Sequence, residues 1–118
     1  MPCGVLVVED DPDLRHLMHR LLSLEGFDPQ VAANGLEALD ILRSAPPPRV
    51  ILLDLMMPVM DGWQFRQQQR ADPQLAGIPV VVTTAVPQIE RLNELKAAAI
   101  LHKPWDLSEL LDAVRRYC

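Results

Sequence analysis

The chain has 118 residues, of which 49 % are hydrophobic and 23 % charged, and its net charge at pH 7 is −5. This length and composition predict a single globular domain whose core needs no disulfides. The acidic balance argues against a nucleic-acid-binding surface. The sequence also lacks a long apolar run and a basic leader, so we expect no membrane span and no signal peptide.

The first part of the chain predicts two strand–helix units. The aliphatic run at residues 5–8 stops at three acidic residues and is typical of a buried strand. Asp11 and Pro12 favour a helix start at that point, and Gly26 is a plausible stop for the helix. Residues 27–33 indicate a weaker strand, residues 34–35 are consistent with a turn, and residues 36–42 predict a short helix.

The second part predicts three more units. Strands are expected at residues 50–53, 78–82 and 98–101, and helices at residues 61–70, at 89–96 and from Asp106 onward. The last helix has an apolar stripe made of Leu107, Leu110, Leu111 and Val114. We interpret RQQQR, residues 66–70, as a solvated face. Five such units predict an α/β fold with a parallel sheet covered on both faces.

Polar residues follow four of the predicted strands: Glu9 and Asp10, then Asp54, then Thr84, then Lys103. In a parallel sheet these positions share one edge, where α/β proteins bind their ligands. Crowded carboxylates repel one another, and a Mg²⁺ ion, which prefers oxygen ligands, would relieve that repulsion. The ammonium and hydroxyl groups could hold anionic oxygens. The set predicts a phosphoryl group carried on Asp54, acting as a carboxylate nucleophile.

Four motifs together resemble the receiver domain of two-component response regulators, over nearly the whole chain. They are VLVVEDDPDLR at residues 5–15, DLMMPVMDG at 54–62, VVVTTA at 80–85 and HKPW at 102–105. The resemblance implies a flavodoxin-like (βα)5 fold, with a doubly wound five-stranded parallel sheet in the order 2-1-3-4-5. We expect residues 1–118 to form one cytoplasmic, chemotaxis-regulator-like receiver domain, with no output domain in this chain.

The resemblance also implies the role of each site residue. Asp54 would be the phosphoacceptor. Asp10, Asp54 and the backbone carbonyl of Met56 would bind Mg²⁺, or Mn²⁺ as a substitute, and Glu9 would act mainly through a metal-bound water. Thr84 would be the switch hydroxyl.

Further along the chain, the resemblance assigns Lys103 as the phosphate-binding lysine, followed by a peptide bond to Pro104 that is commonly cis in the family. Pro58 and Gly62 would shape the loop after Asp54. The implied phosphodonor is a sensor histidine kinase or a histidine phosphotransfer protein. The chain would be no enzyme beyond its own phosphorylation and dephosphorylation, and it would contact neither nucleic acid nor membrane directly.

Some positions depart from the family pattern. The fourth helix is predicted to be short or irregular, with Pro87 near its start. Ile100 stands where many members place an aromatic switch residue, and we interpret it as core; Trp105 replaces a more typical Phe and is expected to be packed. Because Met56 and Val86 are apolar and expected to flank the site, we predict slow self-dephosphorylation.

Three alternatives remain open from the sequence. A degenerate receiver would only bind partners. An aspartyl phosphatase of similar design would carry a second Asp two residues after the nucleophile, where this chain has Met56. A flavodoxin-like electron carrier would need a phosphate loop where this chain has acidic residues. Cys3 and Cys118 lack a metal-binding spacing, and we interpret them as free thiols.

Overall fold

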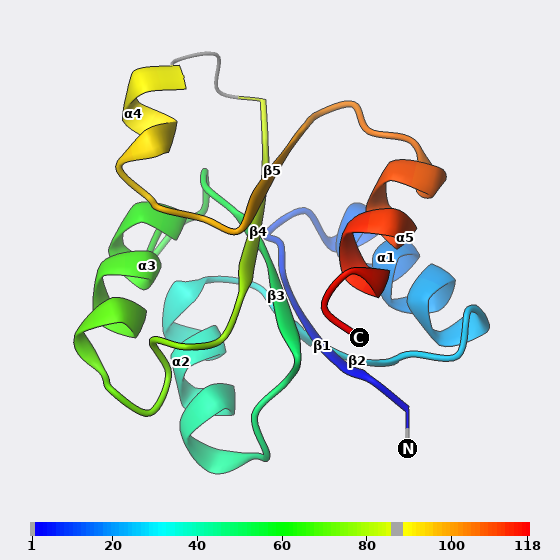
Figure 1. Ribbon diagram of the computed structural model, residues 1–118, viewed down its shortest axis with the longest axis horizontal. Helices are drawn as coiled ribbons and strands as arrows, with labels where there is room; N and C mark the ends of the chain where they lie inside the picture. The colour runs from blue at the N-terminus through cyan, green and yellow to red at the C-terminus, as the bar shows by residue number, and fades with distance from the viewer. Residues whose placement is uncertain (1, 86–88) are drawn as a thin grey trace.

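The computed structural model describes residues 2–85 and 89–118, and in these ranges strands and helices alternate strictly. In chain order the elements are β1 Gly4–Val8, α1 Pro12–Leu24, β2 Asp28–Ala32, α2 Gly35–Ser44, β3 Val50–Asp54, α3 Gly62–Ala71, β4 Val80–Thr84, α4 Ile89–Asn93, β5 Ala99–His102 and α5 Leu107–Arg115. The five strands form one parallel sheet in the order β2-β1-β3-β4-β5 (Figure 1). This confirms the predicted flavodoxin-like fold.

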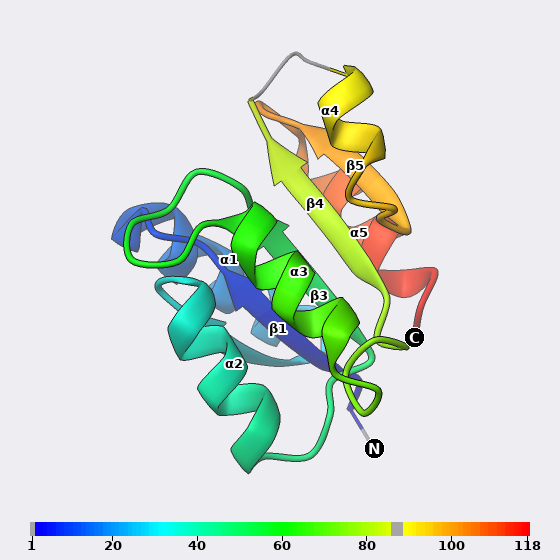
Figure 2. The same ribbon diagram turned by 90° about the vertical axis from the view of Figure 1, so that its left-hand side faces the viewer.

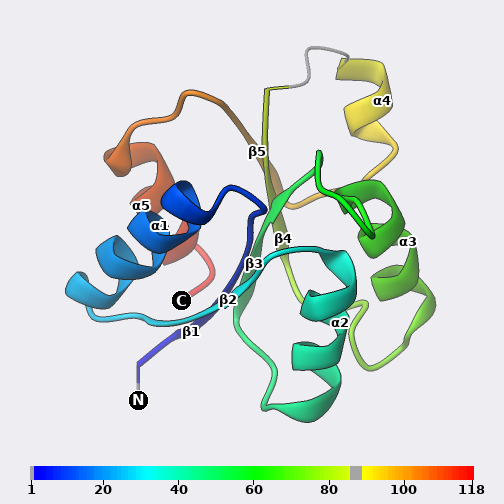
Figure 3. The ribbon, with the colours of Figure 1, turned by 180° about the vertical axis from the view of Figure 1, so that it is seen from behind.

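Helices cover both faces of the sheet. Helices α1 and α5 pack on one face, and α2, α3 and α4 lie on the other (Figures 1 and 3). Strands β3 and β4 are buried along their whole length, because their continuous aliphatic sequences feed the cores on both faces. Within the described ranges, no helix is both long enough and apolar enough to cross a bilayer.

Side-chain caps fix where several helices begin. The Asp11 carboxylate accepts hydrogen bonds from the backbone N–H groups of Asp13 and Leu14, so α1 begins at Pro12 as predicted. Asn34 was predicted to lie in a turn, but it is the N-cap residue of α2. Its side chain caps α2 by accepting from the Glu37 N–H at 2.9 Å, so the helix begins at Gly35, one residue earlier than expected.

The interpretation of residues 66–70 as a solvated face is wrong for two of them. Arg66 is 8 % exposed and Gln69 is fully buried. The Gln69 amide donates to the backbone carbonyls of Leu75 and Ile78, and the Arg66 guanidinium donates to the carbonyl of Leu95. These polar side chains are buried because they satisfy backbone acceptors of the neighbouring loops.

The free-thiol interpretation is also wrong. Cys3 and Cys118 form a disulfide, with their Cα atoms 5.9 Å apart and a sequence separation of 115. Helix α5 runs back along the sheet, so the C-terminus ends beside the start of β1 (Figure 1). No spacing rule could show this pairing, since it depends on where the two chain ends lie in space.

The positions that depart from the family pattern, around α4 and β5, are largely as predicted. Helix α4 is short, ending at Asn93 rather than at residue 96. Ile100 packs against the core under α2 and α3, and Trp105 packs against the core under α1 and α5, both partly buried. Pro87 and Val86 lie outside the described residues.

Candidate functional site

The sheet register brings the polar strand ends to one level. Val8 pairs with Leu53, so Glu9 follows at the level of Asp54. Asp54 in turn pairs with Thr83, which places Thr84 one residue further along the same edge. The parallel pairing of these short strands therefore brings the predicted residues together at the carboxyl edge of the sheet.

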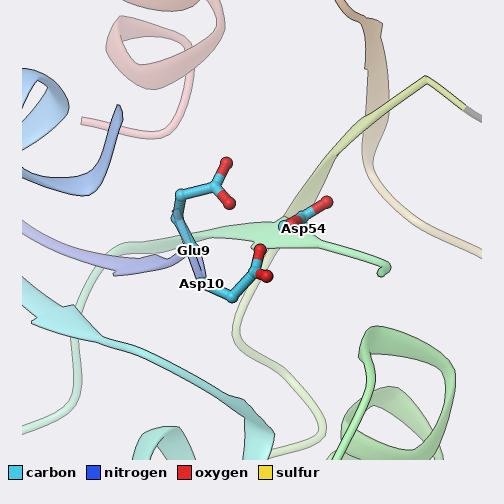
Figure 4. A group of neighbouring side chains, drawn as sticks. All are labelled: Glu9, Asp10 and Asp54. Carbon is cyan, nitrogen blue, oxygen red and sulfur yellow. The ribbon is translucent and has the colours of Figure 1, made fainter. Parts of the chain in front are cut away.

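Three carboxylates converge there. Glu9, Asp10 and Asp54 each offer an oxygen, and these oxygens lie within 4.8 Å of one another (Figure 4). Glu9 and Asp54 are buried, at 2 % and 6 % exposed, and Asp10 is more open to solvent. Negative groups this close and this poorly hydrated repel one another strongly.

Lys103, the residue directly after β5, supplies the countercharge. Its Nζ donates to Glu9 Oε1 at 2.8 Å and lies 3.5 Å from Asp54 Oδ1. Partial burial disfavours the charged ammonium, but the hydrogen bond to Glu9 and the charges of Asp54 and Glu9 outweigh that effect and raise the pKa of Lys103. One cation thus serves two buried carboxylates, which leaves the group with an excess of negative charge.

That excess acts on Asp54. Burial, followed by its hydrogen bond with Glu9 and the Glu9 charge, raises the pKa of Asp54 from 3.8 to about 7, although Lys103 opposes the shift. A raised pKa in a buried carboxylate beside other carboxylates makes Asp54 a candidate for chemistry or for binding a cation. Any added positive charge here would favour the ionised, nucleophilic form.

The residues present fit a hard divalent cation. Mg²⁺ takes oxygen ligands at about 2.0–2.1 Å in octahedral geometry, so its ligand oxygens lie about 3–4 Å apart. Three carboxylate oxygens within 4.8 Å of one another can close on such an ion with small adjustments. Among the described residues this is the sole His, Cys, Asp and Glu cluster suited to a metal, and the exposed His16, His19 and His102 take no part in it.

The remaining predicted residues lie nearby, with different surroundings. Thr84 is buried at the end of β4, and its carbonyl accepts from the Lys103 N–H at 2.7 Å. Met56 follows β3 in the loop, and its side chain is 67 % exposed. The Lys103–Pro104 peptide is cis, as the resemblance implied.

Glycine 62 has a specific steric role in the loop after Asp54. A Cβ at this position would lie 2.5 Å from the Asp54 carbonyl oxygen and 2.7 Å from the Leu55 Cα. The Gly62 N–H donates to the Leu55 carbonyl at 2.9 Å. The start of α3 therefore packs directly on the backbone that carries Asp54, which confirms that Gly62 shapes this loop.

Sequence reasoning missed Arg15. Its Nη1 donates to the backbone carbonyls of Glu9 at 2.9 Å and Asp10 at 3.3 Å, so it fixes the backbone of two acidic residues. Because α1 is capped at Asp11, residue 15 lies one turn into the helix, above the loop. The sequence signal that could have indicated this role is the spacing: Arg15 stands four residues after Asp11, the helix cap that follows the first strand.

Comparisons with known proteins agree with this geometry. The model of the response regulator receiver domain matches residues 5–115. The chain is 34 % identical to sporulation initiation phosphotransferase F of Bacillus subtilis, over 96 % of this chain and 91 % of that protein. It spans half the length of several other curated relatives, among them mycobacterial response regulators at 39 % identity over 98 % of this chain.

Solved structures are similarly close. Chemotaxis protein CheY4 of Vibrio cholerae superposes with a TM-score of 0.91 at 30 % identity, and the match covers all of both chains. The Mn²⁺-bound form of response regulator Rcp1 gives a TM-score of 0.80 at 28 % identity, covering 98 % of this chain and 91 % of that one.

Proposed function

The chain belongs to the response regulator receiver domain family, and from this we propose that Asp54 is its phosphoacceptor. The observation that carries the proposal is the contact set of Asp54, a buried carboxylate beside two further carboxylates and one lysine. A partner phosphohistidine would be the donor. Asp54 would attack the phosphorus, the P–N bond would break, and the released imidazole would take up a proton.

We further propose that Mg²⁺, with Mn²⁺ as a possible substitute, is held by Asp10, Asp54 and the Met56 carbonyl, with Glu9 acting through a bound water. When bound, the ion would supply charge neutralisation for the carboxylates and for the incoming phosphoryl oxygens. The convergence of three carboxylates supports this ligand set. The Mn²⁺-bound Rcp1 structure shows that a similar protein takes a divalent ion.

Lys103 and Thr84 would then bind oxygens of the phosphoryl group. Lys103 already reaches Asp54 at 3.5 Å, so its ammonium could pair with a phosphoryl oxygen on that carboxylate after a small displacement. Thr84 lies at the same edge, and the Lys103 N–H is bonded to the Thr84 carbonyl. A change at the phosphoryl group would therefore reach β4 and β5 together, and such a change can shift a two-state protein surface.

The phosphatase alternative is less well supported. Such an enzyme needs an acid–base group near the nucleophile, and the residue two positions after Asp54 is Met56, a thioether that neither donates nor accepts a transferable proton. Nor does the described chain offer another carboxylate cluster of this kind. We propose a signalling role, in which the chain catalyses only its own phosphorylation and dephosphorylation.

The direct test is intact-mass analysis after incubation with acetyl phosphate and Mg²⁺. We expect the mass of one phosphoryl group to be gained, and the gain to disappear in Asp54→Asn or with EDTA. Asp112→Asn, an exposed carboxylate on α5, is the matched control and should still gain the group. A gain retained by Asp54→Asn would contradict the assignment. No gain despite measured Mg²⁺ binding would indicate a receiver specific for its protein donor, and no gain without Mg²⁺ binding would favour a chain that only binds partners.

A further inference from the structure

A polar cavity lies between α3 and α4, two helices on the side of the molecule that Figure 2 turns toward the viewer. Its volume is about 540 Å³, and the charged side chains lining it are Arg66, Arg70, Arg91 and Glu94. Three guanidinium groups against one carboxylate leave an excess of two positive charges, in a chain whose net charge is −5. We call this cavity the α3–α4 cleft. The net charge of the residues lining the α3–α4 cleft is thus opposite in sign to the net charge of the whole chain.

Arg66 is held rigidly in the wall of the cleft. Its Nε and Nη2 donate to the backbone carbonyls of Leu95 and Lys96 at 2.8 and 2.9 Å, and Nη1 donates to Gln69 Oε1 at 2.8 Å. All of these acceptors are neutral. Burial, together with the neighbouring Arg70, lowers the pKa of Arg66, so the guanidinium lies in a positive, poorly hydrated environment. A negative group entering the cleft would be favoured there.

The other two arginines are better placed to meet a ligand. The Arg91 guanidinium lies 4.4 Å from the centroid of the Trp63 ring, a cation–π contact that pre-orders it. Arg70 is exposed one turn after Arg66 on α3. Among the side chains that the structure describes, neither Arg70 nor Arg91 pairs with a carboxylate.

The kind of occupant follows from the exposure and composition of the lining. Small-molecule sites are mostly apolar and enclose most of their ligand, whereas Arg70, Arg91 and Glu94 form an exposed, charged rim. Tryptophan and arginine are the residues most enriched in protein–protein hot spots. We propose that the α3–α4 cleft docks an acidic segment of a partner protein, with its carboxylates on Arg70 and Arg91 and its apolar side chains against Trp63.

This surface does not depend on phosphoryl transfer at Asp54, so the test uses the unphosphorylated chain. A short Glu-rich peptide with interspersed leucines is titrated at constant ionic strength, and NMR follows the Trp63 indole and arginine Nε signals. We expect these signals to shift to saturation, while the same peptide with Gln in place of Glu shifts them little. Arg91→Gln and Arg70→Gln should each weaken binding about tenfold.

Arg116→Gln is the matched control, because it removes an exposed arginine at the end of α5, outside the cleft. It should bind the peptide like the unchanged chain, and the spectra of all variants report whether they stay folded. Equal binding by the Gln peptide would overturn the proposal, and so would affinity unchanged in both cleft variants. Binding of inorganic pyrophosphate to the cleft more tightly than the peptide would also overturn it, in favour of a small-oxyanion site.

Discussion

Lys103 donates a hydrogen bond from Nζ to Glu9 Oε1 at 2.8 Å, joining β5 to the end of β1 across 94 residues of sequence. In the chain without metal, Lys103 is therefore the countercharge of a buried glutamate. A cation taken up beside Glu9 would release Lys103 for other oxygens, including those of a phosphoryl group on Asp54. Metal binding at the carboxylates should therefore favour phosphoryl recognition by the same lysine, which makes their coupling measurable.

The first prediction concerns the metal-free stability of the Asp54 site. Asp54 binds its proton more tightly in the folded chain, where its pKa is about 7, than in the unfolded chain, where it is 3.8. Its contribution to stability is fully present below pH 3.8 and is lost as the pH rises through about 7. At pH 7 without metal, Asp54→Asn should raise the free energy of unfolding by about 2 kcal/mol, measured by urea denaturation.

Two comparisons sharpen that prediction. At pH 4 the gain from Asp54→Asn should shrink, because Asp54 is then protonated in the folded chain. Added Mg²⁺ should stabilise the unchanged chain more than Asp54→Asn, because the proposed metal site forms only in the folded chain and includes Asp54. If Asp54→Asn destabilised the metal-free chain at neutral pH, the carboxylate repulsion inferred here would be wrong.

A second prediction tests the packing of α3 on the Asp54 backbone. Gly62→Ala places a Cβ 2.5 Å from the Asp54 carbonyl oxygen, a contact that only backbone movement can relieve. We expect a loss of about 2 kcal/mol in stability and slower phosphorylation by acetyl phosphate. Gly77→Ala is the control, since a Cβ there would meet nothing within 4 Å. Equal behaviour of the two variants would refute the steric role of Gly62.

The third prediction concerns a strained residue in the same loop. Val59 has φ of 68°, a conformation that β-branched residues avoid, and its side chain is 75 % exposed. Val59→Gly should relieve the strain without loss of core packing, and should raise the melting temperature through a gain of about 1 kcal/mol. Val59→Ala keeps a Cβ and should gain less. A lower melting temperature for Val59→Gly would show that the side chain has a stabilising contact.

The fold was predictable because its strongest signals are local. Aliphatic runs with no alternation indicated β1, β3 and β4, and the parallel topology then brought Glu9, Asp54 and Lys103 to one edge. The candidate site followed from strand ends alone, without knowledge of side-chain positions. The errors in element bounds, of one to three residues, moved none of these residues off that edge.

What could not be predicted depends on long-range geometry. Arg66 and Gln69 look solvated in sequence, but backbone carbonyls of later loops accept their hydrogen bonds and allow burial. The partners of Arg15 are backbone atoms, which no motif records. The cysteine pair depends on the path of α5, which ends beside β1 only once the whole sheet has formed.

The fourth prediction is the lifetime of the phosphoryl group. Met56, at 67 % exposed, has no group able to orient a water for attack on phosphorus, so we expect slow loss of the phosphoryl group. The decay is followed by intact mass after removal of acetyl phosphate, with Mg²⁺ present. Met56→Gln adds an amide that can hold a water and should shorten the lifetime. A half-life of only seconds in the unchanged chain would contradict this account.

The last prediction concerns the bond between Cys3 and Cys118. This disulfide joins residues 115 positions apart. A cross-link over a loop of about that length lowers the conformational entropy of the unfolded chain and so stabilises the folded state by roughly 3–5 kcal/mol. We expect the purified chain, unfolded without reductant, to resist alkylation. We also expect Cys3→Ser with Cys118→Ser to lower the melting temperature while leaving phosphorylation intact, because both residues lie at the amino end of the sheet, away from Asp54. Reductant should destabilise the unchanged chain but leave the double variant unaffected. Ready alkylation of both thiols before reduction would instead restore the free-thiol interpretation made from the sequence.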